Sequence, residues 1–243
     1  MTPGVPLPGW VGTLVGIDSP ALTEMMSVLG FDFLLVDLEH GAVTETTLVQ
    51  HVMAARVPVL ARLADSSEVA VKRGADTGVD AIVVPHVQSG AAAADIVRWA
   101  KYPPVGGRSL GLSRNTLLGY GLADAMKDAA KPVVIAQIED AAGVADVASI
   151  CRTPGIDSVF IGPYDLSASL GEAGNFETGA FLTAVERVVT AAGAQGITVG
   201  VFAPTPQAWR RFRDLGCQYV VLSSDSLLLA DGARRALDQV RAE

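Results

Sequence analysis

Short apolar segments alternate with longer, alanine-rich segments along almost the whole chain, and this alternation is the feature that most constrains the fold. Runs of apolar and β-branched residues predict eight strands, at Trp10–Ile17, Phe33–Asp37, Val57–Leu63, Ala81–Val87, Pro132–Ile138, Ser158–Ile161, Ile197–Phe202 and Tyr219–Leu222. The segments between and after them predict helices, at Pro20–Leu29, Glu45–Ala55, Ser67–Thr77, Gly90–Ala100, Gly143–Cys151, Gly179–Ala194, Pro206–Leu215 and Ser226–Arg241. Strands that are apolar at nearly every position are typical of parallel sheets covered on both faces.

Eight strand–helix units in 243 residues match the count and size of a (β/α)₈ TIM barrel. A doubly wound open sheet is the alternative, but no Gly-x-Gly-x-x-Gly motif opens a helix after a first strand. No linker or change of composition divides the chain, so we expect residues 1–243 to form one domain. The glycine-rich stretch Tyr102–Gly121 is predicted to be a functional loop.

Composition narrows the class of protein. The net charge of −8 and the pI near 4.9 argue against nucleic acid or an anionic membrane as partner. No run of about 18 apolar residues could span a bilayer, and the first residues lack the pattern of a signal peptide. The two cysteines, Cys151 and Cys217, are too few for a disulfide framework or a zinc site. We therefore expect a cytoplasmic protein that acts on a small molecule.

Polar side chains follow several predicted strands at the point where each strand ends. They are Asp37, Glu39, His40, Arg62, His86, Gln88, Gln137, Glu139, Asp140 and Asp165. In a barrel of parallel strands these ends meet at one mouth, where ligands bind. The bland alternative is that strands must stop somewhere and that polar residues mark ordinary loops. Gln137 and Glu139 are more selective, because strand alternation puts both on the same face.

Two acids that follow adjacent strands are candidate metal ligands. Glu139 and Asp165 could together hold a hard, oxygen-ligated cation such as Mg²⁺ or Mn²⁺. The alternative is that each acid caps the helix that follows it.

The three histidines receive different interpretations. His40 follows a buried strand and could shuttle protons near neutral pH, with Asp37 orienting its ring; the alternative is an exposed loop histidine. His51 lies within a predicted helix and is interpreted as structural. His86 follows Pro85 at a strand end and could line the mouth, but it is assigned no role.

Arg62 and the turn at Gly162 are candidate anion-binding groups. An arginine at the end of a buried strand needs an anionic partner, either a substrate oxygen or a structural acid such as Asp37 or Asp76. Gly162 permits close backbone approach, and the amides after Pro163 suit a small carboxylate. An ordinary tight turn is the alternative there.

Four segments in order resemble one family. They are FDFLLVDLEHG (31–41), KYPPVGGRSLGLSRNTLLGYG (101–121), AQIEDAAGV (136–144) and GIDSVFIGPYDLSASLG (155–171). Together they resemble the HpcH/HpaI aldolase family, whose members are class II, metal-dependent pyruvate aldolases built on a (β/α)₈ barrel. The resemblance extends from about residue 10 to residue 225.

The resemblance implies a metal site and an acid–base site. Glu139 and Asp165 would ligate Mg²⁺ or Mn²⁺, with Co²⁺ as a further candidate, and Glu39 would order waters near the metal. His40 would be the acid/base, supported by Asp37. Two further residues complete the implied site, namely Arg62, which would contact the keto or enolate oxygen, and Asp76, which matches an acid that often reaches towards the His–Asp dyad.

It also implies a pyruvate pocket. Gln137 would line it, and the backbone from Gly162 through Pro163 to Tyr164 would hold the pyruvate carboxylate. Tyr164 stands where many members have a small residue, and Ser109 replaces a common glycine in the loop that helps complete neighbouring subunits' sites. Both departures concern the acceptor aldehyde.

The implied reaction is reversible aldol cleavage of a 4-hydroxy-2-oxo acid to pyruvate and an aldehyde, through a metal-stabilised enolate of pyruvate, in a homo-oligomer that is often hexameric. The nearest alternative is a related lyase that acts on a CoA thioester or on an enolate from oxaloacetate. A non-catalytic barrel that binds a small acid is an alternative of a different class. It predicts a broken site, whereas every matched position carries a competent residue.

Overall fold

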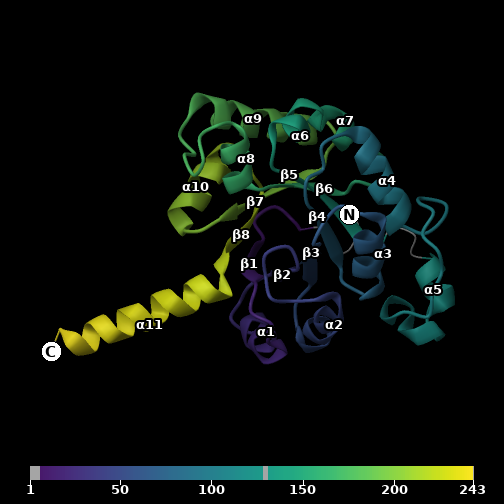
Figure 1. Cartoon of the computed structure of the whole chain (residues 1–243), viewed down its shortest axis with the longest axis horizontal. Coiled ribbons are helices and arrows are strands. Elements are labelled where there is room, and N and C mark those ends of the chain that lie inside the picture. Colours follow the sequence, from purple (N-terminus) through teal and green to yellow (C-terminus); the bar gives the residue numbers. More distant parts are fainter. Residues whose placement is uncertain (1–5, 128–130, 243) are drawn as a thin grey trace.

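Eight parallel strands close into a barrel in residues 6–127 and 131–242, which the computed structural model describes. Each strand pairs with its neighbours in sequence, and the last strand pairs with the first (Figure 1). The strands are β1 (Val11–Val15), β2 (Phe33–Asp37), β3 (Val59–Arg62), β4 (Ala81–Val84), β5 (Val133–Ile138), β6 (Ser158–Ile161), β7 (Thr198–Ala203) and β8 (Tyr219–Ser224). The predicted TIM barrel is confirmed. The first five residues, part of the stretch examined for a signal peptide, lie outside the described residues.

Helices follow the strands and surround the barrel in Figure 1. They are α1 (Pro20–Ser27), α2 (Glu45–Ala54), α3 (Glu68–Asp76), α4 (Gly90–Ala100), the 3₁₀ segment η1 (Arg114–Gly119), α5 (Leu122–Lys127), α6 (Ala141–Ala145), α7 (Val147–Arg152), α8 (Pro163–Ser169), α9 (Gly179–Gly193), α10 (Pro206–Asp214) and α11 (Asp225–Arg241). None of these helices in the described residues is long and apolar enough to cross a membrane.

Several sequence-based boundaries differ from the structure, and for two of them the reason can be identified. The predicted helix Gly143–Cys151 is two helices, α6 and α7, because Asp146 leaves the helical conformation and its carboxylate accepts a hydrogen bond from the Gly90 amide at 2.8 Å. The first strand ends at Val15 rather than Ile17. The amides of Gly16 and Ile17 instead donate to Asp225 at the start of α11.

The strands are buried on both faces, as their sequences predict. Inside the barrel, Phe33, Leu35 and Tyr219 belong to one apolar cluster. Leu34 and Val36 belong to a second cluster, which lies between the barrel and its helices. Because side chains alternate along a strand, the inward-facing series of β2 continues from Phe33 and Leu35 to Asp37. The same alternation carries the inward series of β5 to Gln137, so the packed interior opens into a polar mouth.

Helix α11 departs from this arrangement, because it extends away from the barrel (Figure 1). Its start is held by Asp225, and its first turns contact β1 and β8. Several large apolar side chains along it are exposed to solvent, namely Leu227, Leu228, Leu229, Leu237 and Val240.

Candidate functional site

A buried ion pair joins the ends of β2 and β3 at the barrel mouth. The strand register places Asp37 directly beside Arg62. Arg62 donates from Nε to Asp37 Oδ1 at 2.8 Å and from Nη2 to Oδ2 at 2.7 Å. Among the partners that the sequence left open for Arg62, the structure therefore selects Asp37.

The environment keeps Arg62 charged. Burial disfavours the charged guanidinium, but the hydrogen bonds and negative charge of Asp37 outweigh it and raise the pKa of Arg62 above its usual value. Glu39 adds to this effect, with its Oε2 at 3.3 Å from Arg62 Nε. A fixed positive charge at a strand end is suited to stabilising a substrate oxyanion.

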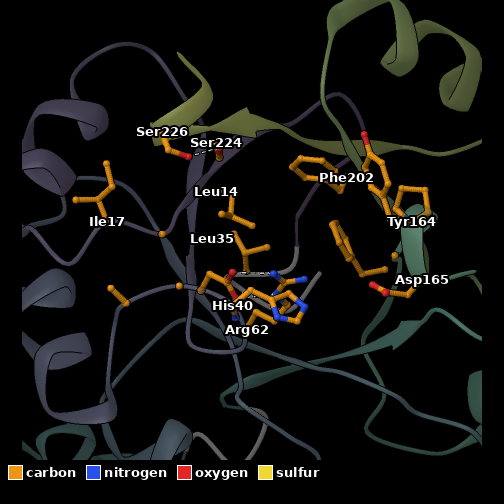
Figure 2. Close-up of a pocket in the computed structure, with 17 residues that line it drawn as sticks. Leu14, Ile17, Leu35, His40, Arg62, Tyr164, Asp165, Phe202, Ser224 and Ser226 are labelled. Atoms are coloured by element: carbon orange, nitrogen blue, oxygen red, sulfur yellow. Dashed lines mark hydrogen bonds and ion pairs between the residues drawn. The ribbon is translucent and has the colours of Figure 1, made fainter. Parts of the chain in front are cut away.

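Asp37 also shapes the loop that carries His40. Its Oδ1 accepts hydrogen bonds from the amides of Glu39 at 3.1 Å and His40 at 3.4 Å. The imidazole of His40 points into the mouth (Figure 2), and 65% of this side chain is exposed. Asp37 thus positions the backbone of His40 while both its oxygens bind Arg62. The implied His–Asp dyad stays a prediction.

Glu139 lies deep in the mouth beyond the end of β5, and its side chain is 1% exposed. The Gln137 amide donates to its Oε2, and the backbone N–H of His86 donates to its Oε1 at 2.7 Å. Gly162 makes room for it, because a Cβ atom at that position would lie 2.7 Å from Glu139 Oε2. Glycine is therefore required at residue 162 for Glu139 to keep this position.

Asp165 reaches the mouth from α8 and points towards the same space as His40 (Figure 2). The carboxylate does not join the tightest group of potential metal ligands in the described residues. That group is Glu39, His86 and Glu139, whose ligand atoms lie within 4.8 Å of one another.

A cavity of about 440 Å³ opens beside these groups. Asp37, His40, Arg62 and Asp165 line one part of it, and Figure 2 labels the last three of these residues. The remainder is lined by Gly162, Pro163 and Tyr164 at the start of α8 and by apolar or small residues, namely Leu14, Gly16, Ile17, Leu35, Gly41, Ala42, Phe160, Phe202, Ser224 and Ser226. The volume suits a small organic acid.

The charges of the mouth are suited to a divalent cation. With the imidazoles counted as neutral, the four carboxylates of Asp37, Glu39, Glu139 and Asp165 exceed the one guanidinium of Arg62 by three negative charges. Burial, opposed by Arg62 and reinforced by the charge of Glu139, raises the pKa of Glu39. Glu39 Oε2 is buried and has no hydrogen-bond partner in the described part of the chain. A cation would compensate this excess charge.

Two further predictions concern residues away from the mouth. Asp76 ends α3, so it lies towards the opposite end of the barrel, and its carboxylate accepts from the buried Arg108. Within one chain the structure does not bring Asp76 to the other site residues.

His51 is structural, as predicted, since its ring nitrogens contact Thr23 Oγ1 at 2.6 Å and Asp18 Oδ1 at 3.0 Å.

His86 is the mouth residue to which sequence reasoning gave no role. Its position after Pro85 at a strand end was a signal that it could line the mouth. Its contact with Glu139 depends on a backbone φ of 52° and on the register of β4 against β5. Neither can be read from the sequence.

The fold and the site define a (β/α)₈-barrel protein whose functional side chains gather at the carboxyl ends of the strands. Residues 11–232 match the family described as HpcH/HpaI aldolase/citrate lyase. The chain belongs to this family, which confirms the resemblance drawn from the four sequence segments.

Similar proteins carry aldolase names. A hydroxypyruvate/pyruvate aldolase of Delftia acidovorans is 36% identical over 238 residues, which cover 95% of this chain and 88% of that protein. A 5-keto-4-deoxy-D-glucarate aldolase of Escherichia fergusonii is 30% identical, covering 95% and 92%. The crystal structure of an HpcH/HpaI aldolase/citrate lyase family protein from Burkholderia cenocepacia superimposes with a TM-score of 0.89 at 31% identity, covering 98% of this chain and 95% of that one.

Proposed function

We propose that this protein is a class II, metal-dependent pyruvate aldolase that cleaves a 4-hydroxy-2-oxo acid to pyruvate and an aldehyde. The observation that carries the proposal is the mouth itself. There an exposed imidazole and a charged, buried guanidinium border a small cavity beside an excess of buried carboxylate charge. Membership of the family and the aldolase names of its relatives support the same reaction.

Glu139 and Asp165 would hold the divalent cation, with Mg²⁺, Mn²⁺ or Co²⁺ as candidates and Glu39 ordering water beside it. When bound, the cation supplies a Lewis acid for the substrate's keto oxygen. A Schiff-base route is disfavoured at Lys101, because this buried lysine donates to Asp157 at 2.6 Å.

The chain's own residues would bind substrate and move the proton. His40 removes a methyl proton from pyruvate through a water molecule in condensation, and it returns a proton in cleavage. Asp37 occupies Nε and Nη2 of Arg62, so the enolate oxygen would meet Nη1. Asp76 would act from a neighbouring subunit, because it ends α3 away from the mouth of its own barrel.

The carboxylate end of pyruvate would lie against the start of α8, where Gly162, Pro163 and Tyr164 all line the cavity. Gln137 is buried beneath it and holds Glu139 by a hydrogen bond.

A panel of 4-hydroxy-2-oxo acids that differ in the aldehyde half, assayed for pyruvate release with Mn²⁺ present, tests the function. At least one acid is expected to be cleaved. Turnover confined to oxaloacetate or a CoA thioester would instead identify a related lyase. Binding of pyruvate without turnover of any substrate would identify a non-catalytic barrel.

Tyr164 is expected to control the aldehyde preference. Its ring is half exposed at the cavity and packs edge-on against Phe176, with 5.1 Å between ring centroids. Tyr164→Ala should change the ratio of kcat/KM values for large and small aldehydes by about tenfold, since pocket shape discriminates at this level. Exchange of the pyruvate methyl protons should change little. Tyr164→Phe removes the hydroxyl group and keeps the ring, so it separates the contribution of the hydroxyl from that of the ring. Unchanged preference in both variants would contradict this role.

We also propose that the protein is a cytoplasmic homo-oligomer, with a hexamer as the expected form. Both cysteines are free and buried, which suits a reducing compartment. Leu229 and Val240 are 66% and 73% exposed on α11, and their spacing of eleven residues puts them on one helix face. A second copy covering this face would remove both from water.

The double substitution Leu229→Glu and Val240→Glu is therefore expected to lower the oligomeric mass measured by light scattering. Asp238→Lys, on the opposite face of α11, is the matched control and should leave the mass unchanged. An unaltered mass in the double variant would show that this face is not an interface.

A further inference from the structure

His86 has an unusual backbone conformation beside a proposed metal ligand. Its φ of 52° lies in the left-handed region, which is uncommon for residues other than glycine, although histidine enters it more often than most. This conformation aims its backbone N–H at Glu139 Oε1, at 2.7 Å, and puts its ring Nδ1 3.2 Å from the same oxygen. The imidazole therefore borders Glu139, and 56% of the His86 side chain is exposed to solvent.

The other side of the imidazole borders a second carboxylate. Nε2 of His86 lies 3.7 Å from Glu39 Oε1. The ligand atoms that Glu39, His86 and Glu139 offer lie within 4.8 Å of one another. Atoms that share one cation, with bonds of about 2.0–2.3 Å, are roughly 3 to 4.5 Å apart. Nδ1 of His86 and Oε1 of Glu139, 3.2 Å apart, are therefore already at a separation at which they could share one ion, with Glu39 beside them.

An independent observation also points to a ligand in this space. The side chain of Glu39 is nine-tenths buried, yet its Oε2 has no hydrogen-bond partner within the residues that the structure describes. Arg62 Nε lies 3.3 Å from this oxygen, but Nε and Nη2 donate their hydrogen bonds to Asp37. A buried carboxylate oxygen without a donor is costly unless a cation or water satisfies it.

We propose that His86 supplies an imidazole nitrogen to the metal that Glu139 binds, so that this chain has a mixed nitrogen and oxygen site. The proposal rests on the metal-dependent function above. An imidazole ligand favours Co²⁺ and later transition metals, whereas Mg²⁺ prefers oxygen ligands. His86 would thus determine which divalent metal the protein prefers. The carboxylates alone would not produce this preference.

The test is pulsed electron paramagnetic resonance of the full-length protein loaded with Mn²⁺ alone, without substrate. Directly bound imidazole nitrogen is expected to give ¹⁴N modulation of the Mn²⁺ echo. The modulation should disappear in His86→Asn, a substitution that tolerates a positive φ. Few imidazoles could cause this modulation, because the chain has three histidines. The buried His51 already has both ring nitrogens in contact with other side chains. His40→Asn should retain the modulation.

Metal titrations by calorimetry give a second measurement. His86→Asn is expected to weaken Co²⁺ binding at least tenfold and Mg²⁺ binding much less, with an unchanged melting temperature of the metal-free protein as the control for folding. Bound Mn²⁺ without ¹⁴N modulation, or modulation that persists in His86→Asn, would overturn the proposal and leave the aldolase function standing. Nitrogen modulation in a protein that cleaves no oxo acid would instead refute the function alone. Failure to bind any divalent metal would refute both.

Discussion

Stripping divalent metal from the protein with EDTA is expected to abolish pyruvate release from its oxo acid substrate, and adding Mn²⁺ or Mg²⁺ should restore it. The physical reason is the charge of the mouth, where buried carboxylates exceed the guanidinium of Arg62. Without a cation, nothing but Arg62 and water would stabilise the negative charge that develops on the keto oxygen. The rate with EDTA should therefore fall by at least about a hundredfold.

The same prediction can be made for single residues. Glu139→Gln keeps the shape of the side chain and removes its charge, so it should reduce the rate to a similar extent and weaken Mn²⁺ binding. Asp165→Asn should behave likewise if Asp165 is the second ligand. Glu186→Gln, on the exposed side of α9, is the matched control and should leave both quantities unchanged. Full activity in a chelated, metal-stripped sample would contradict the class II mechanism.

The fold could be predicted because its determinants are local and repeated. The strands are apolar at most positions on both faces, and this pattern favours a covered parallel sheet. The split between α6 and α7 could not be predicted, because it depends on a contact between Asp146 and Gly90, which are 56 residues apart. Local propensity contains no information about such a partner.

In the candidate site, too, some features could be predicted from local sequence, and others depend on contacts between distant residues. Strand ends identified the residues of the mouth, and strand alternation correctly placed Gln137 and Glu139 together. The register between strands decided the rest. It placed Asp37 beside Arg62, and it brought His86 next to Glu139. These pairings depend on which residues of neighbouring strands lie side by side, and a single sequence does not specify that.

Replacing His40 is expected to remove proton transfer while leaving the fold intact. In His40→Ala, exchange of the pyruvate methyl protons with deuterated water, followed by proton NMR, should slow by about 10²- to 10⁴-fold, the usual contribution of a general acid–base. The side chain is largely exposed, with its nearest charged neighbour, Glu39 Oε2, at 3.9 Å. The free energy of unfolding should therefore change by no more than about 0.5 kcal/mol.

Asp37→Asn supplies the contrast that assigns the role. Asp37 is buried and binds Arg62 with both oxygens, so removing its charge leaves a buried guanidinium without its partner. This variant should lose about 3 kcal/mol of stability as well as activity. In His40→Ala only the activity should fall, and added imidazole should restore part of the exchange. Unchanged exchange in His40→Ala would exclude His40 as the acid–base group. A matched loss of stability would instead show that His40 has a structural role.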